Sequence, residues 1–201
     1  MTGNVNLKEL EKRAFKSTFQ DGLWDIQLGL IILGIALTAF ITNDYFLIPY
    51  YAVIIVLFIA AKKFITVPRI GLVKFGKERK KSMNKLRLIL VISVLFGLAM
   101  VLITKRDMLS GIIEFPVGLI IVSLNVLIVF SLMAYFMDFE RLYYYAVLVS
   151  VSFPMAEILE VNGLISNGSY VFLVSSGIMV ITGTVLLIRF MREYSVEKAN
   201  Q

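Results

Sequence analysis

Six stretches of about twenty mostly apolar residues dominate the chain and limit how it can fold. A transmembrane helix needs about 20 such residues, because a helix of that length crosses the hydrocarbon layer of a bilayer. The chain is 59% hydrophobic with a mean hydropathy of +0.85, whereas soluble domains are roughly 45–50% apolar. We therefore expect an all-α integral membrane protein whose six transmembrane helices lie at residues 23–42, 46–65, 86–104, 112–136, 142–159 and 170–190.

The distribution of Lys and Arg predicts how these spans are oriented. With the N-terminus in the cytoplasm, 18 of the 20 basic residues fall in cytoplasmic segments, and only Lys105 and Arg106 fall outside. Such an excess of positive charge is typical of cytoplasmic loops. We expect both termini in the cytoplasm and the protein in a prokaryotic plasma membrane. The first 22 residues lack a signal-peptide pattern and are expected to form either a cytoplasmic amphipathic helix or a soluble cap.

The two halves of the chain repeat each other in order. DGLWDIQLGLII, which begins at Asp21, is echoed by SGIIEFPVGLII, which begins 89 positions later at Ser110 and pairs Asp25 with Glu114. Three further echoes follow at offsets of 94, 92 and 83–84 positions. Each copy holds three predicted spans, so the second copy must enter the membrane from the opposite face. We predict two inverted three-helix repeats, at residues 23–104 and 105–190, followed by a cytoplasmic tail at residues 191–201.

Two acidic residues lie at equivalent positions of the predicted repeats. Asp25 stands at the start of the first span and Glu114 at the start of the fourth. Ionisable groups inside membranes are costly and commonly functional, so the pair can be read as gates or ion sites reached from opposite faces. The alternative is structural, because an acid in the first turn of a helix interacts favourably with the helix dipole.

The fourth and fifth spans contain further polar candidates for a transport pathway. Pro154 removes a backbone hydrogen bond and frees the carbonyl of Ser150, with Ser152 and Glu157 nearby. This arrangement can bind a cation or a hydrogen-bond donor, or it can be a kink that neighbouring helices satisfy. Asn125 places an amide inside the fourth span, where polar side chains usually bond between helices and less often line a path.

The segment between the second and third spans is strongly basic. We expect a cytoplasmic loop at residues 62–87 that fixes the topology. Its cations also suit contact with anionic lipid headgroups. The residues predicted to make this contact are Lys62, Lys63, Arg69, Lys74, Lys77, Arg79, Lys80 and Lys81. Nucleic acid is not expected as a partner, since no recognition fold or stacking surface accompanies the charge.

The absence of two residue types narrows the possible functions. The chain contains no His and no Cys, so neither can serve as catalytic base, nucleophile or soft-metal ligand. We expect no enzymatic activity, no cofactor and no metal site. The first hypothesis is a transporter or channel-like pathway for a small solute or ion between the inverted repeats. The alternative is a non-transporting scaffold or lipid-binding protein that docks through its basic loop. Besides the bilayer and its anionic lipids, the sequence is compatible with a homo-oligomer.

Overall fold

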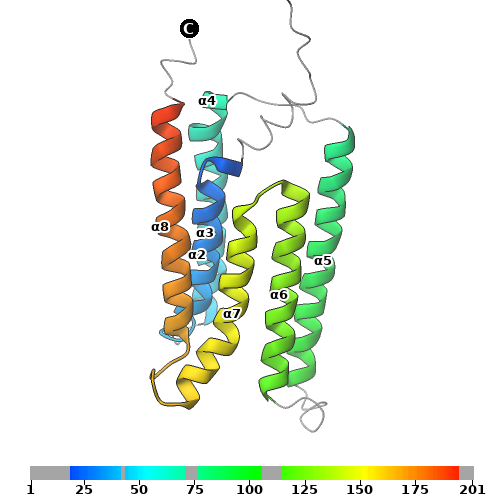
Figure 1. Ribbon diagram of the computed structural model, residues 1–201, viewed down its shortest axis with the longest axis vertical. Helices are drawn as coiled ribbons and strands as arrows, with labels where there is room; N and C mark the ends of the chain where they lie inside the picture. Colours follow the sequence, from blue (N-terminus) through cyan, green and yellow to red (C-terminus); the bar gives the residue numbers. More distant parts are fainter. Residues whose placement is uncertain (1–18, 42–43, 71–76, 106–114, 195–201) are drawn as a thin grey trace, which may run out of the picture. The chain divides into compact units, whose positions relative to one another are not determined.

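The computed structural model describes residues 19–41, 44–70, 77–105 and 115–194, which form helices and no β-strand. Figure 1 shows the helices as long rods. In chain order they are α2 (Leu23–Leu37), the 3₁₀ turn η1 (Asp44–Phe46), α3 (Leu47–Ala61), the π-helix η2 (Lys62–Thr66), α4 (Val67–Ile70), α5 (Lys77–Lys105), α6 (Phe115–Met137), α7 (Arg141–Val161) and α8 (Ser169–Glu193).

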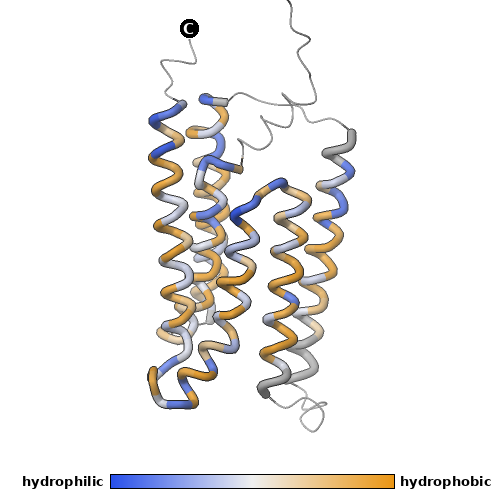
Figure 2. Tube along the Cα trace, viewed as in Figure 1, coloured by the Kyte–Doolittle hydropathy of each residue, from blue (hydrophilic) through white to orange (hydrophobic). Residues whose placement is uncertain are grey.

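Among the described residues, four helical stretches are long and apolar enough to cross a membrane. They are Leu47–Arg69, Gly118–Met137, Arg141–Val161 and Ser169–Glu193, and Figure 2 shows their apolar character. These helices confirm the prediction of an all-α integral membrane protein. The other two predicted spans also form helices, but they are not among these four. α2 has only 15 residues, which at 1.5 Å each reach about 22 Å, less than the roughly 30 Å of the hydrocarbon layer.

The helices group into two compact units. Unit 1 comprises residues 1–76 and 172–201, and unit 2 comprises residues 77–171. Unit 1 thus contains α2, α3, η2, α4 and almost all of α8, while unit 2 contains α5, α6 and α7. Each unit therefore combines two consecutive helices from one half of the chain with one helix from the other half.

In unit 1, α2 and α8 cross antiparallel at glycines. A Cβ on Gly183 would lie 2.7 Å from the backbone nitrogen of Ile26 and 2.8 Å from the carbonyl oxygen of Gly22. A Cβ on Gly29 would lie 3.0 Å from the nitrogen of Val180. Since small residues let helix backbones approach closely inside membranes, these glycines set the distance between α2 and α8.

The other neighbour of α2 in unit 1 is α3, which also runs antiparallel to it. The hydroxyl of Tyr50 donates a 2.8 Å hydrogen bond to the carbonyl of Leu30, and that of Tyr51 donates a 3.4 Å bond to the carbonyl of Ile31. Gly34 leaves room for both rings, because a Cβ there would lie 2.6 Å from the Tyr51 oxygen. α2 is thus the central helix of its unit, which explains why its buried residues do not lie on a single face.

In unit 2, hydroxyl groups connect α6 to both of its neighbours. Ser93 on α5 donates a 3.1 Å hydrogen bond to the side-chain oxygen of Asn125 on α6. Ser123, also on α6, donates a 2.6 Å bond to the carbonyl of Ser150 on α7. Hydrogen bonds of this kind replace the hydrophobic effect, which does not drive helix association in lipid.

α6 and α7 each end at a residue with a left-handed backbone conformation, and this conformation lets the following amide bond to a carbonyl of the last turn. Asp138 has φ 50° and Gly163 has φ 68°. After them, the amides of Phe139 and Leu164 bond to carbonyls five residues back, at 3.0 and 2.9 Å. This is the Schellman pattern, in which the residue after the helix takes a left-handed conformation. It makes the α6–α7 turn short.

Parts of the predicted domain organisation differ from the observed helices. The predicted loop at residues 62–87 is helical at Lys62–Ile70 and again from Lys77 onward. Its Lys, Arg, Glu and Met residues are good helix formers, so the helices continue beyond the apolar spans. α8 likewise continues to Glu193, into the predicted tail. The predicted amphipathic helix lies mostly in residues 1–18, outside the described residues.

Candidate functional site: a buried charge cluster in unit 1

A buried carboxylate precedes α2 and is held by three hydrogen bonds. Asp21 has an exposed fraction of 0%. Its Oδ1 accepts a 3.1 Å bond from the backbone amide of Leu23, and its Oδ2 accepts 2.6 Å bonds from Lys62 Nζ and Thr66 Oγ1. Gly22, with φ 80°, makes the sharp bend that lets Asp21 fold back over the start of the helix.

The two side-chain donors to Asp21 come from a single π-helical turn. η2 begins at Lys62 and ends at Thr66, between α3 and α4. Residues four apart lie on the same face of a helix, so both side chains reach the same carboxylate oxygen. π-Helical turns inside α-helices are rare and occur frequently at functional sites. The turn therefore marks this end of α3 as a candidate site.

A second buried acid lies close to the ion pair. Asp25, in the first turn of α2, follows Asp21 by four residues and also has an exposed fraction of 0%, and its negative charge acts on the Lys62 ammonium. Lys62 itself is 18% exposed, and its Nζ lies 5.8 Å from the centre of the Phe58 ring. One carboxylate thus pairs directly with the ammonium group, and the charge of a second buried carboxylate acts on it. We call Asp21, Asp25, Lys62 and Thr66 the charge cluster.

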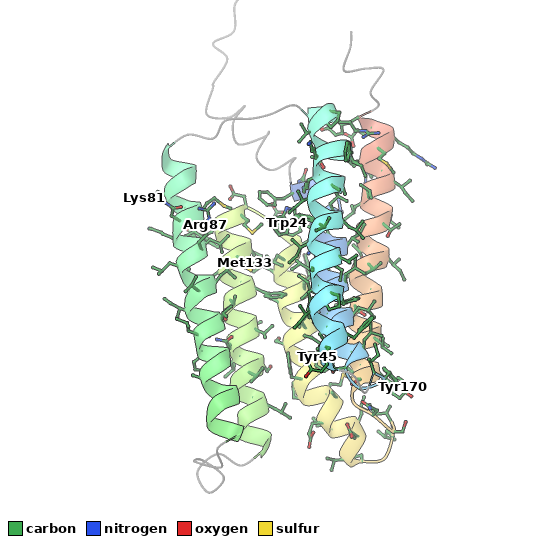
Figure 3. The ribbon with its side chains drawn as sticks, turned by 180° about the vertical axis from the view of Figure 1, so that it is seen from behind. Trp24, Tyr45, Lys81, Arg87, Met133 and Tyr170 are labelled. Atoms are coloured by element: carbon green, nitrogen blue, oxygen red, sulfur yellow. The ribbon has the colours of Figure 1, made fainter. Side chains whose placement is uncertain are left out.

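Aromatic rings lie beside the charge cluster. The Trp24 ring packs edge-on against Phe58 at a centroid distance of 4.9 Å, and the centroid of the Phe19 ring lies 5.7 Å from that of Trp24. Figure 3 shows Trp24 toward the α4 end of unit 1 and Tyr45 toward the opposite end. Rings beside a buried ion pair lower the local dielectric, which strengthens the attraction between the charges and raises the cost of separating them.

The predicted site residues that the structure describes divide between the two units. The charge cluster includes Asp25, while Glu114 lies outside the described residues. The remaining candidates are all in unit 2, on α6 or α7: Asn125, Ser150, Ser152, Pro154 and Glu157. Ser150 and Ser152 are buried, and each donates to a carbonyl of its own helix, Val147 at 3.0 Å and Leu148 at 2.7 Å.

The carbonyl that Pro154 frees has a partner on the neighbouring helix. Pro154 lies inside α7 and cannot donate to the carbonyl of Ser150. Instead, Ser123 on α6 donates to that oxygen at 2.6 Å. The structure thus provides the neighbouring-helix partner that a kinked membrane helix requires, which was the structural alternative for Pro154.

We expect Ser123→Ala to lower the free energy of unfolding by about 0.5–1.5 kcal/mol, because the Ser150 carbonyl then lacks its donor. In a Pro154→Ala background the same substitution is expected to have almost no effect, since the amide of residue 154 can bond to Ser150. Thermal unfolding of the four proteins in detergent measures this coupling. Equal losses from Ser123→Ala in both backgrounds would contradict it.

The residues predicted to contact lipid headgroups also divide into several groups. Lys62 has its ammonium bonded to Asp21 inside the protein, and Arg69 donates a 2.8 Å bond to the carbonyl of Ile65. Lys63 and Lys81 are exposed. Lys74 lies outside the described residues, and the side chains of Lys77, Arg79 and Lys80 on α5 are not described.

Sequence reasoning missed two members of the charge cluster. Asp21 was assigned to the segment before the first span, and Thr66 to the predicted loop. One signal was available for each residue, because Asp21 precedes Asp25 by four positions and Thr66 follows Lys62 by four. This is the spacing of one helical face. The contact between the two pairs joins residues more than forty positions apart and has no local signature.

The chain matches no protein-family model, no curated protein and no solved structure.

Proposed function

We propose that the chain is a transport protein in which two inverted three-helix repeats form a pathway for a small solute or ion. The observation that carries this proposal is the charge cluster, with two fully buried carboxylates and a partly buried ammonium in a membrane protein. Replacing buried ion pairs with apolar residues often leaves stability unchanged or improves it. Buried charges within membranes therefore mark ion or substrate pathways more often than structural supports.

The composition of the units supports the inverted repeat. If α2, α3 and α5 are one copy and α6, α7 and α8 the other, each unit holds the first two helices of one copy and the third helix of the other. The first helix of each copy contacts the third helix of the other antiparallel, at Gly29–Val180 and at Ser93–Asn125. When the repeat offsets are applied to the Gly29–Val180 contact, the equivalent contact in the other unit is expected within about one helical turn of the observed Ser93–Asn125 contact.

The charge cluster belongs to only one copy of the proposed repeat. The position equivalent to Asp21 is Ser110, and an offset of 94 positions places Ala156 opposite Lys62. Only Asp25 has an acidic counterpart, Glu114. We infer that unit 1 responds to the transported or coupled ion, while Glu114 is the matching acid at the other end of the pathway. The proposed topology has six spans and cytoplasmic termini.

The test is flux through purified protein in liposomes, measured for protons, alkali cations, halides and a panel of small metabolites. We expect Asp25→Asn and the double variant Asp21→Asn/Lys62→Gln to slow the flux at least about tenfold, since both remove charged groups from the site. Lys63→Gln is the matched control, because this exposed neighbour lies on the same helical turn. It is expected to transport at the wild-type rate.

Orientation in the liposomes can be read directly, because the chain has no cysteine. A single cysteine at Ser82 is expected to react only from the cytoplasmic side, and one at Asn167 only from the other side. With orientation established, wild-type protein that moves no member of the panel would favour the alternative function, a non-transporting scaffold. If wild type and both cluster variants transported at equal rates, the charge cluster would take no part in transport.

A further inference from the structure

The exposed face of α5 changes from basic to apolar along its length. Lys81 and Lys85 are exposed, and Leu88, Ile92 and Leu95 continue the same face with exposed fractions of 61, 57 and 59%. Spacings of three and four residues place all five side chains on one side of the helix. In an integral membrane protein an exposed apolar stripe faces lipid chains, so α5 enters the hydrocarbon near Leu88.

Arg87 stands at the same boundary on a neighbouring face of α5. It is exposed, and Val91 and Val94, one and two turns further on, are exposed as well. Figure 3 shows Lys81 and Arg87 toward the beginning of α5. Leu86, between the basic residues, is buried, so the helix presents its cations to the outside and not to α6.

Exposed tyrosines mark the same level of unit 2. Ser82 Oγ lies 3.5 Å from the carbonyl oxygen of Phe136, which brings the beginning of α5 beside the end of α6. Tyr135, on that end of α6, and Tyr143 and Tyr144, in the first turn of α7, are exposed. Exposed tyrosines gather where the hydrocarbon meets the headgroups, so this end of the unit is an interface with headgroups.

The basic residues lie at the depth of phosphate groups. Lys85 and Lys81 precede Leu88 by three and seven residues, about 5 and 10 Å along the helix. The headgroup layer on each side of a bilayer is roughly 5–8 Å thick, and Lys and Arg side chains extend toward it along the helix surface. The acids at this end, among the described residues of unit 2, are Glu78 in the first turn of α5 and Asp138 and Glu140 in the α6–α7 turn.

We propose that Lys81, Lys85 and Arg87 form a binding surface for the phosphate groups of anionic phospholipids in the surrounding bilayer. It differs from the headgroup contact expected of a loop, because a rigid helix presents the cations at a fixed depth beside an apolar stripe. Lys85 and Arg87 become part of the site, and Lys62 does not. The surface is independent of the charge cluster and of the proposed transport.

The experiment titrates the purified full chain with phosphatidylglycerol or phosphatidylcholine and counts the bound lipids by native mass spectrometry. Lys81→Gln/Lys85→Gln/Arg87→Gln is compared with Lys63→Gln/Arg189→Gln/Arg192→Gln, which removes three exposed cations from unit 1. We expect wild type and the control to prefer phosphatidylglycerol, and the α5 variant to lose at least about fivefold of that preference. Unfolding followed by Trp24 fluorescence checks that both variants remain folded.

Two outcomes would overturn the proposal. Wild-type protein that binds the two lipids equally would show that no anionic headgroup site exists. An equal loss of preference in the control variant would show that anionic-lipid binding depends on the total charge of the protein and not on the α5 surface. Lys81→Arg/Lys85→Arg keeps the charge and is expected to retain the preference; its loss in this variant would also contradict the proposal.

Discussion

Lys62→Met is expected to lower the free energy of unfolding by about 3–5 kcal/mol. Removing one member of a buried ion pair leaves the other charge without compensation in a medium of low dielectric constant. Here Asp21 is fully buried and would lose its bond of 2.6 Å to the ammonium. Asp25, also buried, would lose the nearby positive charge. Methionine retains most of the side-chain volume, so the loss of unfolding free energy measures the effect of removing the positive charge.

The double variant Lys62→Met/Asp21→Asn is expected to recover most of this stability, because both charges of the pair are then removed. Lys63→Met is the matched control, an exposed lysine on the same turn. Unfolding can be followed by the fluorescence of Trp24, the only tryptophan, which packs against Phe58 beside the cluster. If Lys62→Met were as stable as the Lys63→Met control, the ion pair would not compensate the buried charge of Asp21.

Gly183→Ala is the second substitution with a large expected effect, a loss of about 1–3 kcal/mol from overpacking. The new methyl group would lie 2.7 Å from the Ile26 nitrogen and 2.8 Å from the Gly22 oxygen. Both are backbone atoms, so α2 and α8 would have to move apart. The bend at Gly22, which positions Asp21, lies at this crossing, and we expect the substitution to disturb the charge cluster too.

Gly177→Ala provides the comparison for this prediction. Gly177 lies on the same helix, and a Cβ there would have no atom within 4 Å among the described residues. The control should therefore gain from the better helix propensity of alanine, by up to about 1 kcal/mol. Thermal unfolding of both variants in the same detergent measures the difference. Equal stabilities would show that the α2–α8 crossing tolerates a wider separation.

Much of the secondary structure could be predicted from local sequence. The spans predicted at 112–136, 142–159 and 170–190 correspond to α6, α7 and α8 with ends displaced by a few residues. Apolar length is a local property, and it determines where a helix can lie in lipid. The errors fall at polar ends: α2 stops at Leu37, and α5 begins at Lys77 in the predicted loop. A charged helix is stable beyond the membrane, so hydropathy does not mark its start.

The candidate site was predicted only in part. Asp25 was predicted as a candidate from its position at the start of a span, because ionisable groups inside membranes are costly and commonly functional. Its environment was not, since Lys62 was assigned to the lipid surface by its place in a basic run. An ammonium can bind an external phosphate or an internal carboxylate, and charge patterning does not distinguish the two. The bond of Ser123 to the carbonyl freed by Pro154 depends in the same way on a second helix.

The apolar helices of this protein follow from the amino-acid sequence alone, because hydrophobic length and charge act on each segment separately. Which helices meet depends on tertiary packing. α8 lies against α2 because Gly22, Gly29 and Gly183 remove the side chains that would separate them, and helix shape in lipid decides packing where hydrophobicity cannot. The packing of α3 against α2 joined Asp21 to Lys62, and this contact compensates the buried charge of Asp21.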